Sequence, residues 1–138
     1  MRSYLKYIFI LFVFTFSCTP YNFEDFYFYE DVNCIEDIQK WVNDNIEYKK
    51  DTIEEWASPQ RTLYRGYGDC EDFAILIIAI AHKKLDKKCS LLIVQPTSGN
   101  CHATVFDKGK VYDSTSVGIY EKDYFLVYEY KYDNIPMY

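Results

Sequence analysis

Cys70 is the residue of this chain whose type and position most favour covalent chemistry. It follows the glycine-bracketed residues 66–69 and precedes the apolar residues 73–81, which predict a helix. The first N–H groups and the dipole of a helix stabilise a thiolate, so a cysteine here is expected to be a better nucleophile than a free one. Asp69 is the predicted N-cap of this helix. The alternative is a buried structural cysteine that begins a core helix, and Cys70 alone does not decide between the two.

A cysteine nucleophile usually needs a nearby base, and the chain has two histidines. His82 lies twelve residues beyond Cys70 on the same predicted helix, about 18 Å away at about 1.5 Å per residue, which is too far. His102 is therefore the candidate base. It lies in the mostly apolar and β-branched residues 101–106, which predict a strand. The alternative is a histidine with a purely structural role on that strand.

Asp113 is the candidate acid that orients His102. A two-residue turn at Lys108-Gly109 predicts a hairpin in which Thr104 pairs with Asp113. Because side chains alternate along a strand, His102 shares a face with Thr104, and Asp113 becomes its diagonal neighbour at about 7 Å. A register slip of one residue would move Asp113 to the other face. The predicted register thus permits a nucleophile–base–acid set.

These motifs resemble the transglutaminase-like superfamily, and within it the bacterial transglutaminase-like cysteine peptidases. The resemblance rests on Cys70 in Gly-Asp-Cys-Glu-Asp, His102 on a following strand and Asp113 in Val-Tyr-Asp-Ser, and it covers residues 35–116. It implies an α+β fold with a papain-like or transglutaminase-like core, in which the nucleophile helix packs on a small antiparallel sheet. It also implies Cys-His-Asp catalysis, although activity in the family ranges from peptide hydrolysis to amide transfer and some members have lost it.

Two residues upstream of Cys70 are candidate oxyanion donors. The segment Trp56-Ala-Ser-Pro-Gln60 resembles the tryptophan–proline–acid segment of the family, with Gln60 where an acidic residue is commoner. In papain-like enzymes such a glutamine or tryptophan donates to the oxyanion beside the backbone N–H of the cysteine. The alternatives are a surface glutamine and a core tryptophan.

Three acids, Asp69, Glu71 and Asp72, surround Cys70 in the sequence and oppose its ionisation, because like charge raises the pKa of a thiol. In one interpretation they point outward from the first turn of the helix, and the His102 imidazolium outweighs them. In the other they bind calcium, although three carboxylates fall short of the about six to eight oxygens that this ion takes. The expectation is no cofactor, with calcium as the alternative.

The N-terminus has the pattern of an export signal. Arg2 and Lys6 precede the apolar residues 7–16, which are too few to span a bilayer. Cys18 then resembles the lipidated cysteine of bacterial lipoproteins, and plain secretion is the alternative. The expected organisation is a lipoprotein-type signal peptide at residues 1–18, an aromatic tether at residues 19–31 and a transglutaminase-like domain at residues 32–138.

Composition limits the class of protein and its partners. A hydrophobic content of 49% in 138 residues indicates one globular domain with a real core. Loss of Arg2 and Lys6 with the signal leaves 13 basic and 21 acidic residues, a net charge of −8, which argues against a nucleic-acid partner. An exported chain can form disulfides, but Cys34, Cys89 and Cys101 allow at most one pair.

The remaining pattern predicts the elements around the site. Residues 34–48 predict an amphipathic helix, with Asn33 as its cap and Glu36 completing a capping box. Residues 55–63 indicate a short helix or turn, residues 90–95 a buried strand, and residues 120–132 one further strand or two.

The sequence therefore predicts a cysteine hydrolase of the cell envelope that cleaves a peptide or isopeptide bond through a thioester on Cys70. Its partners would be a peptide or protein substrate and, through a lipid anchor, the membrane. Acyl transfer to an amine, as in a transglutaminase, uses the same residues and stays open. A binding lipoprotein that keeps the fold without catalysis is the alternative from another class.

Overall fold

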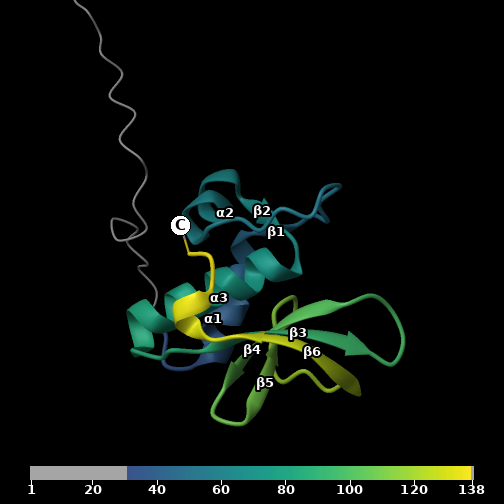
Figure 1. The fold of residues 1–138 in the computed structure, drawn as a ribbon. Helices are drawn as coiled ribbons and strands as arrows, with labels where there is room; N and C mark the ends of the chain where they lie inside the picture. The colour runs from purple at the N-terminus through teal and green to yellow at the C-terminus, as the bar shows by residue number, and fades with distance from the viewer. Residues whose placement is uncertain (1–30, 138) are drawn as a thin grey trace, which may run out of the picture.

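The structure is a computed structural model that describes residues 31–137 of the chain. The elements, in chain order, are α1 (Ile35–Asn45), β1 (Glu47–Tyr48), α2 (Pro59–Arg65), β2 (Tyr67–Gly68), α3 (Cys70–Leu85), β3 (Ser90–Pro96), β4 (His102–Asp107), β5 (Lys110–Asp113), β6 (Tyr124–Tyr130) and the 3-10 turn η2 (Tyr132–Asn134). An antiparallel sheet with the strand order β5-β4-β3-β6 forms one layer, and α1 and α3 form the other (Figure 1). This arrangement confirms the predicted α+β class, with the nucleophile helix on a small antiparallel sheet.

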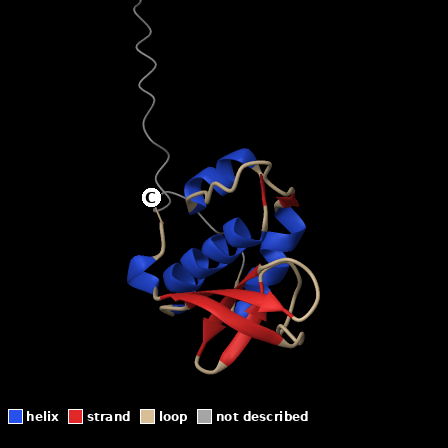
Figure 2. Ribbon diagram, turned by 45° about the vertical axis from the view of Figure 1, so that its right-hand side comes forward, coloured by secondary structure: helices blue, strands red, loops and turns tan. Residues whose placement is uncertain are grey.

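Helix α3 is the centre of the core. Residues 72–81 are all buried, which a helix achieves only when it is covered on every side. The helix packs against β3 and β4 on one side and against α1 and α2 on others (Figure 2). Its N-terminus is therefore held in place by the whole domain.

The β4–β5 hairpin has the predicted register. Thr104 pairs with Asp113, and Asp107 pairs with Lys110 across a two-residue turn. The turn residues Lys108 and Gly109 have φ of 47° and 85°, the left-handed pair that a type I′ turn requires. The turn chemistry thus decides which face of the sheet Asp113 occupies.

The chain approaches Cys70 through a short parallel pairing of β1 with β2. Tyr48 pairs with Gly68, and the backbone N–H of Lys49 donates to the carbonyl of Gly68 at 2.8 Å. Between the two strands in the chain, α2 begins with Pro59 in its first turn and ends at Gly66, whose φ is +72°. Two elements therefore converge immediately upstream of the nucleophile helix.

The predicted cap of α1 is wrong by one residue. Cys34, not Asn33, is the N-cap, and the acid that completes the box is Asp37, not Glu36. The carboxylate of Asp37 accepts hydrogen bonds from the backbone N–H groups of both Asn33 and Cys34, at 2.8 and 3.3 Å. Because Asp37 lies one position after the predicted Glu36, its carboxylate reaches both free N–H groups, and the helix starts one residue later than predicted.

Strand β6 is an edge of the sheet and leaves apolar side chains exposed. Its pairing with β3 shifts register between Ile93 and Val94. The exposed large side chains of the strand are Phe125, Leu126, Val127 and Tyr128. Among the described residues, no helix has the length and apolar character needed to cross a membrane.

Several expectations fall on residues that the structure does not describe. The expected signal peptide, Cys18 and the tether as far as residue 30 lie outside the described residues 31–137. Within that range the four cysteines Cys34, Cys70, Cys89 and Cys101 are free thiols.

Candidate active site

Cys70 is the first residue of α3, as predicted, and Asp69 is the N-cap. The backbone N–H of Asp69 donates at 3.2 Å to Asp72, which is fully buried. Asp72 also accepts from the backbone N–H of Ala57 at 2.7 Å and pairs with the guanidinium of Arg65. Asp72 is therefore a structural acid that ties two loops to the start of the nucleophile helix.

His102 and Asp113 lie in contact, as the hairpin register predicts. The Nε2 atom of His102 lies 3.0 Å from Oδ1 of Asp113, and both side chains are largely buried. The ring of Tyr120 stacks on the imidazole with centroids 5.4 Å apart. Because Nε2 is engaged by the acid, Nδ1 is the nitrogen left to exchange a proton with a nucleophile.

The carboxylate of Asp113 is held in its ionised form. Burial raises its pKa, but hydrogen bonds from His102 and from the backbone N–H of Thr115 outweigh burial and lower the pKa to about 2. The N–H of Thr115 lies 2.9 Å from Oδ1, and the Thr115 hydroxyl lies 3.1 Å from the same atom. Asp113 is therefore a fixed negative charge beside His102 across the physiological pH range.

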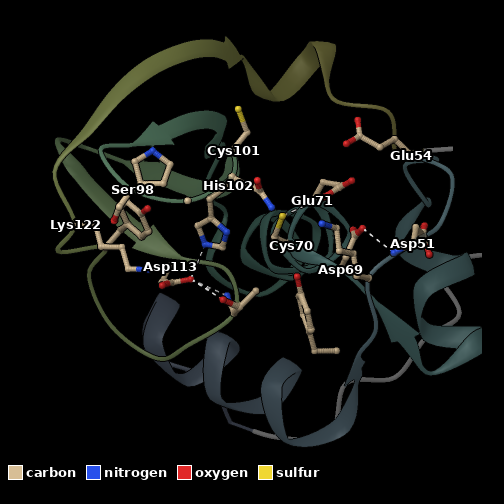
Figure 3. A pocket seen from close by; sticks show the side chains of 17 residues that line it. Asp51, Glu54, Asp69, Cys70, Glu71, Ser98, Cys101, His102, Asp113 and Lys122 are labelled. Carbon is tan, nitrogen blue, oxygen red and sulfur yellow. Dashed lines mark hydrogen bonds and ion pairs between the residues drawn. The ribbon is translucent and has the colours of Figure 1, made fainter.

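One pocket brings the three residues together. It has a volume of about 580 Å³, and Cys70, His102 and Asp113 all contribute to its lining. The imidazole lies between the Asp113 carboxylate and the Cys70 sulfur in the close view (Figure 3). The backbone N–H of Ala103, the neighbour of His102, hydrogen-bonds the sulfur and lowers the thiol pKa. His82 does not line this pocket, and its ring packs on Tyr132 with centroids 4.6 Å apart.

The expected low pKa of Cys70 is wrong for the resting site. Burial raises the pKa of the Cys70 thiol to about 12, and the charges of Glu71 and Asp69 act in the same direction. The sulfur donates to Oε2 of Glu71 at 3.1 Å, which stabilises the thiol form. The helix N-terminus does not overcome burial, which is the largest effect, and the Glu71 carboxylate contacts the sulfur rather than pointing outward, as one interpretation expected.

Asp69 and Glu71 form a tight acidic pair at the rim of the pocket. Burial and then Glu71 raise the pKa of Asp69 to about 6. The Oδ1 atom of Asp69 is buried without a hydrogen-bond partner, while its Oδ2 accepts from the backbone N–H of Asp51 at 3.4 Å. A buried carboxylate oxygen with no partner is costly and is commonly satisfied by a ligand, an ion or water.

The structure does not bring Gln60 or Trp56 into the pocket. Neither side chain contributes to the lining, and the Oε1 atom of Gln60 is buried without a hydrogen-bond partner. Trp56 packs on the main core and edge-on against Tyr130, with centroids 5.1 Å apart. Trp56 is thus a packing residue, as the alternative interpretation had it, and the geometry gives no support to either residue as an oxyanion donor.

Three residues that line the pocket, Tyr48, Tyr120 and Lys122, were not predicted from the sequence. Tyr48 lines the same pocket as Cys70. Burial, and then the charges of Cys70, Asp69 and Glu71, raise the pKa of its phenol. Tyr120 covers His102, and Lys122 is a cation of the lining. None of the three belongs to a motif, and only the fold brings them into the pocket.

Comparisons with known proteins identify the family and the fold. A family model described as a transglutaminase-like domain matches residues 11–112. No curated protein matches the sequence.

Among solved structures, LapG of Legionella pneumophila is similar in fold. It is 23% identical and has a TM-score of 0.55, with 70% of this chain and 62% of LapG covered. Its calcium-bound and EGTA-treated forms give TM-scores of 0.56 and 0.55 at the same identity. This chain thus spans less than two thirds of the length of LapG, and at this identity the likeness shows a shared fold.

Proposed function

The chain belongs to the transglutaminase-like domain family, and from this premise we propose that it is a cysteine hydrolase of peptide or isopeptide bonds. The observation that carries the proposal is the order of Cys70, His102 and Asp113 across one pocket (Figure 3). The likeness to LapG supports the cysteine peptidase branch of the family.

In the first half-reaction Cys70 acts as a thiol that loses its proton during the attack. The sulfur bonds to the carbonyl carbon while the thiol proton passes to Nδ1 of His102. The C–N bond then breaks, and Nδ1 returns the proton to the leaving amine. Proton transfer in the same step fits a resting thiol whose pKa is about 12, because no stored thiolate is required.

In the second half-reaction water hydrolyses the thioester. His102 takes one proton from the water as its oxygen attacks the acyl carbon, and the proton returns to the sulfur as the acid leaves. Asp113 stabilises the imidazolium in both halves, because its carboxylate stays ionised and bound to Nε2.

The oxyanion needs hydrogen-bond donors near the acyl carbon. The backbone N–H of Cys70 is one of the free donors at the start of α3. With Gln60 outside the pocket, the hydroxyl of Tyr48 is the side-chain donor that we propose for the second position. Tyr48→Phe, which removes only that hydroxyl, should slow turnover by about tenfold or more.

Calcium is a proposed ligand of the same rim. LapG has a calcium-bound form, and here Asp69 and Glu71 would hold the ion, with Asp69 Oδ1 free to bind it. The residues that the structure describes hold no set of three metal-binding side chains, so water or backbone oxygens would complete the shell. A bound Ca²⁺ would neutralise the charge that raises the thiol pKa.

This site is tested by the thermal stability of the domain with added calcium and with EGTA. Calcium should raise the melting temperature of the wild type and leave that of Asp69→Asn unchanged. Equal melting temperatures of the wild type in the two conditions would remove calcium from the proposal.

Acyl transfer to an amine is the second candidate within the same chemistry. The pocket lining carries several charged side chains, namely Lys50, Asp51, Glu54, Glu71 and Lys122. Charged walls keep water in a site, and this favours hydrolysis over transfer. Adding a primary amine to the assay and weighing the products distinguishes hydrolysis from transfer.

The central experiment is the capture of an acyl-enzyme. The purified domain is incubated with a quenched-fluorescent library of cell-envelope peptides, with calcium and with EGTA, then acid-quenched and mapped by mass spectrometry. We expect cleavage together with an acyl adduct on Cys70. Cys70→Ala and His102→Ala should abolish both, whereas His82→Ala, a histidine outside the pocket, should not. Cleavage that survives Cys70→Ala would rule out Cys70 as the nucleophile, whereas neither cleavage nor an adduct in either condition would favour a non-catalytic binding protein.

We also propose that the protein is exported and anchored by a lipid on Cys18, where a peptide or protein of the envelope would be its substrate. The support is the pattern of residues 1–18. Metabolic labelling of the full chain with an alkyne fatty acid should mark the wild type and not Cys18→Ser. An unlabelled wild type in the culture medium would indicate plain secretion.

A further inference from the structure

Gln39 is a fully buried polar side chain that the proposed mechanism does not use. It lies on α1, on the same buried face as the apolar Ile35, Ile38 and Val42. A polar residue on such a face needs hydrogen-bond partners inside the protein. The hydrogen-bond partners of Gln39 therefore indicate its role.

The amide group of Gln39 binds the loop that follows Asp113. Its Nε2 donates to the backbone carbonyls of Asp113, Ser116 and Gly118, at 2.5, 3.1 and 2.9 Å. Its Oε1 accepts from the backbone N–H of Gly118 at 2.9 Å. An amide has two N–H hydrogens, so one is shared between carbonyls, and the side chain is fully used.

The same loop is closed on itself and on β4. The backbone N–H of Asp113 donates to the carbonyl of Gly118 at 3.1 Å. The hydroxyl of Ser114 donates to the carbonyl of Ala103 at 2.7 Å, and that of Thr115 reaches the Asp113 carboxylate. Together with those of Gln39, these bonds hold the loop from Asp113 to Gly118 against α1 and β4. Asp113 begins this loop: its carbonyl accepts from Gln39, its N–H donates to Gly118, and it lies opposite Thr104 of β4.

We propose that Gln39 is a positioning residue that holds Asp113 against His102, and so acts on the reaction without touching the reacting atoms. This inference rests on the proposed function, because the chemistry it supports is that of Cys70, His102 and Asp113. The physical reason is that Asp113 ends β5, where the strand no longer fixes the backbone. Without Gln39 the carbonyls of Asp113 and Ser116 lose this donor, and the Gly118 carbonyl keeps that of Asp113, so the loop has to move to find water.

The test uses Gln39→Met, which keeps the length of the side chain and removes all of its hydrogen bonds. Asn45→Leu is the matched control, because Asn45 is an exposed amide of the same helix that bonds only to the carbonyl of Trp41. The probe is p-nitrophenyl acetate, which acylates an activated thiol and needs no knowledge of the natural substrate. Nitrophenolate release gives the rate, and peptide mapping confirms that Cys70 is the acylated residue.

Gln39→Met should slow acylation of Cys70 by about 10- to 100-fold, the loss expected from a displacement near 1 Å. Asn45→Leu should stay within about twofold of the wild type. In an Asp113→Ala background, Gln39→Met should change the rate by less than about twofold, because the residue through which it acts is gone. If Gln39 had only a structural role, Gln39→Met would slow acylation of Cys70 by the same factor in both backgrounds.

A second measurement does not depend on activity. In NMR spectra the Nε2 proton of His102 should appear far downfield in the wild type and lose that shift in Gln39→Met. If Gln39→Met does not fold, Gln39→Glu replaces it, since that variant keeps the shape and the bond from Gly118 and loses the amide donor.

The possible failures are distinguishable. If Asp113→Ala slows acylation but Gln39→Met does not, or if the His102 proton keeps its shift in the folded variant, the inference about Gln39 is overturned. If neither Asp113→Ala nor His102→Ala affects acylation of Cys70, the proposed function fails, and the NMR measurement still decides whether Gln39 positions Asp113.

Discussion

A β-carbon at Gly68 would lie 2.7 Å from the β-carbon of Asp72, closer than real β-carbons approach their neighbours. Gly68 pairs with Tyr48 just before α3 begins, so the residue before the N-cap is pressed against the first turn of the nucleophile helix. This close contact explains on steric grounds why Gly68, the second glycine of the motif, has no side chain. Its φ is not in the left-handed region, unlike that of Gly66.

Gly68→Ala should therefore destabilise the domain by about 2 kcal/mol or more, because neither backbone nor Asp72 can move without breaking buried hydrogen bonds. Gly66→Ala is the control: it meets no atom within 4 Å but carries the strain of φ +72°, which costs about 1 kcal/mol. Urea unfolding of both variants measures the difference. A smaller effect at Gly68 than at Gly66 would contradict the close contact.

Arg65→Met should destabilise the domain by about 3 kcal/mol, because it leaves the fully buried Asp72 carboxylate without its cation. Arg61→Met is the matched control, since its pair with Glu55 is exposed and should contribute less than about 1 kcal/mol. Chemical denaturation at neutral pH compares the two. Equal losses would mean that the Ala57 and Asp69 backbone donors alone keep Asp72 satisfied.

Asp113 should make stability depend on acid pH. Its pKa is lowered to about 2 in the folded state, so its contribution is complete above the ordinary pKa near 4 and disappears as the pH falls toward 2. The contribution is on the order of 2 kcal/mol. The difference in unfolding free energy between the wild type and Asp113→Asn should therefore be large at pH 6 and shrink below pH 3. A difference that is constant with pH would rule out this linkage.

Asp69→Asn should stabilise the metal-free domain at neutral pH. The folded-state pKa of Asp69 is raised to about 6, so its ionised form is unfavourable above that pH, and the penalty is relieved as the pH falls toward 4. In EGTA at pH 7 the variant should gain on the order of 1–2 kcal/mol, and the gain should vanish near pH 4. Thermal or urea unfolding across this range checks the sign, which would be reversed if Asp69 were a purely stabilising cap.

Glu71→Gln should make Cys70 easier to ionise. It removes the carboxylate that accepts from the thiol at 3.1 Å and one of the charges that raise the thiol pKa. Alkylation by iodoacetamide, followed from pH 7 to 10 in EGTA, should show a lower apparent pKa at Cys70 than in the wild type. The buried Cys89, whose pKa burial raises to about 11, serves as the internal reference and should not change.

Local sequence patterns predicted that His102 and Asp113 lie side by side. The turn at Lys108-Gly109 admits one hairpin register, and that register alone places Asp113 beside His102. The glycines before Cys70 and the apolar run after it likewise admit only a helix that begins at the cysteine. In both cases the decisive interactions lie within about a dozen residues of one another in the chain.

Contacts between distant segments were not predictable in the same way. Gln39 has no local feature that distinguishes it from a surface residue of an amphipathic helix, and its partners lie 74 to 79 residues away. The thiol pKa of Cys70 depends on how deeply the site is buried and on the rotamer of Glu71, and neither follows from spacing. That Gln60 does not line the pocket follows from the position of α2 relative to α3, which its spacing from Cys70 does not give.

The complete burial of residues 72–81 of α3 has a consequence for how activity is lost when the protein is warmed. Amide protons of residues 73–81 should exchange with solvent only when the entire domain opens, because every neighbour must leave to expose them. The β4–β5 hairpin lies at one border of the sheet and should open at a lower energy. His102 and Asp113 would then separate from Cys70 while Cys70 stays in place. On heating, activity should therefore be lost some degrees below the unfolding temperature of the domain.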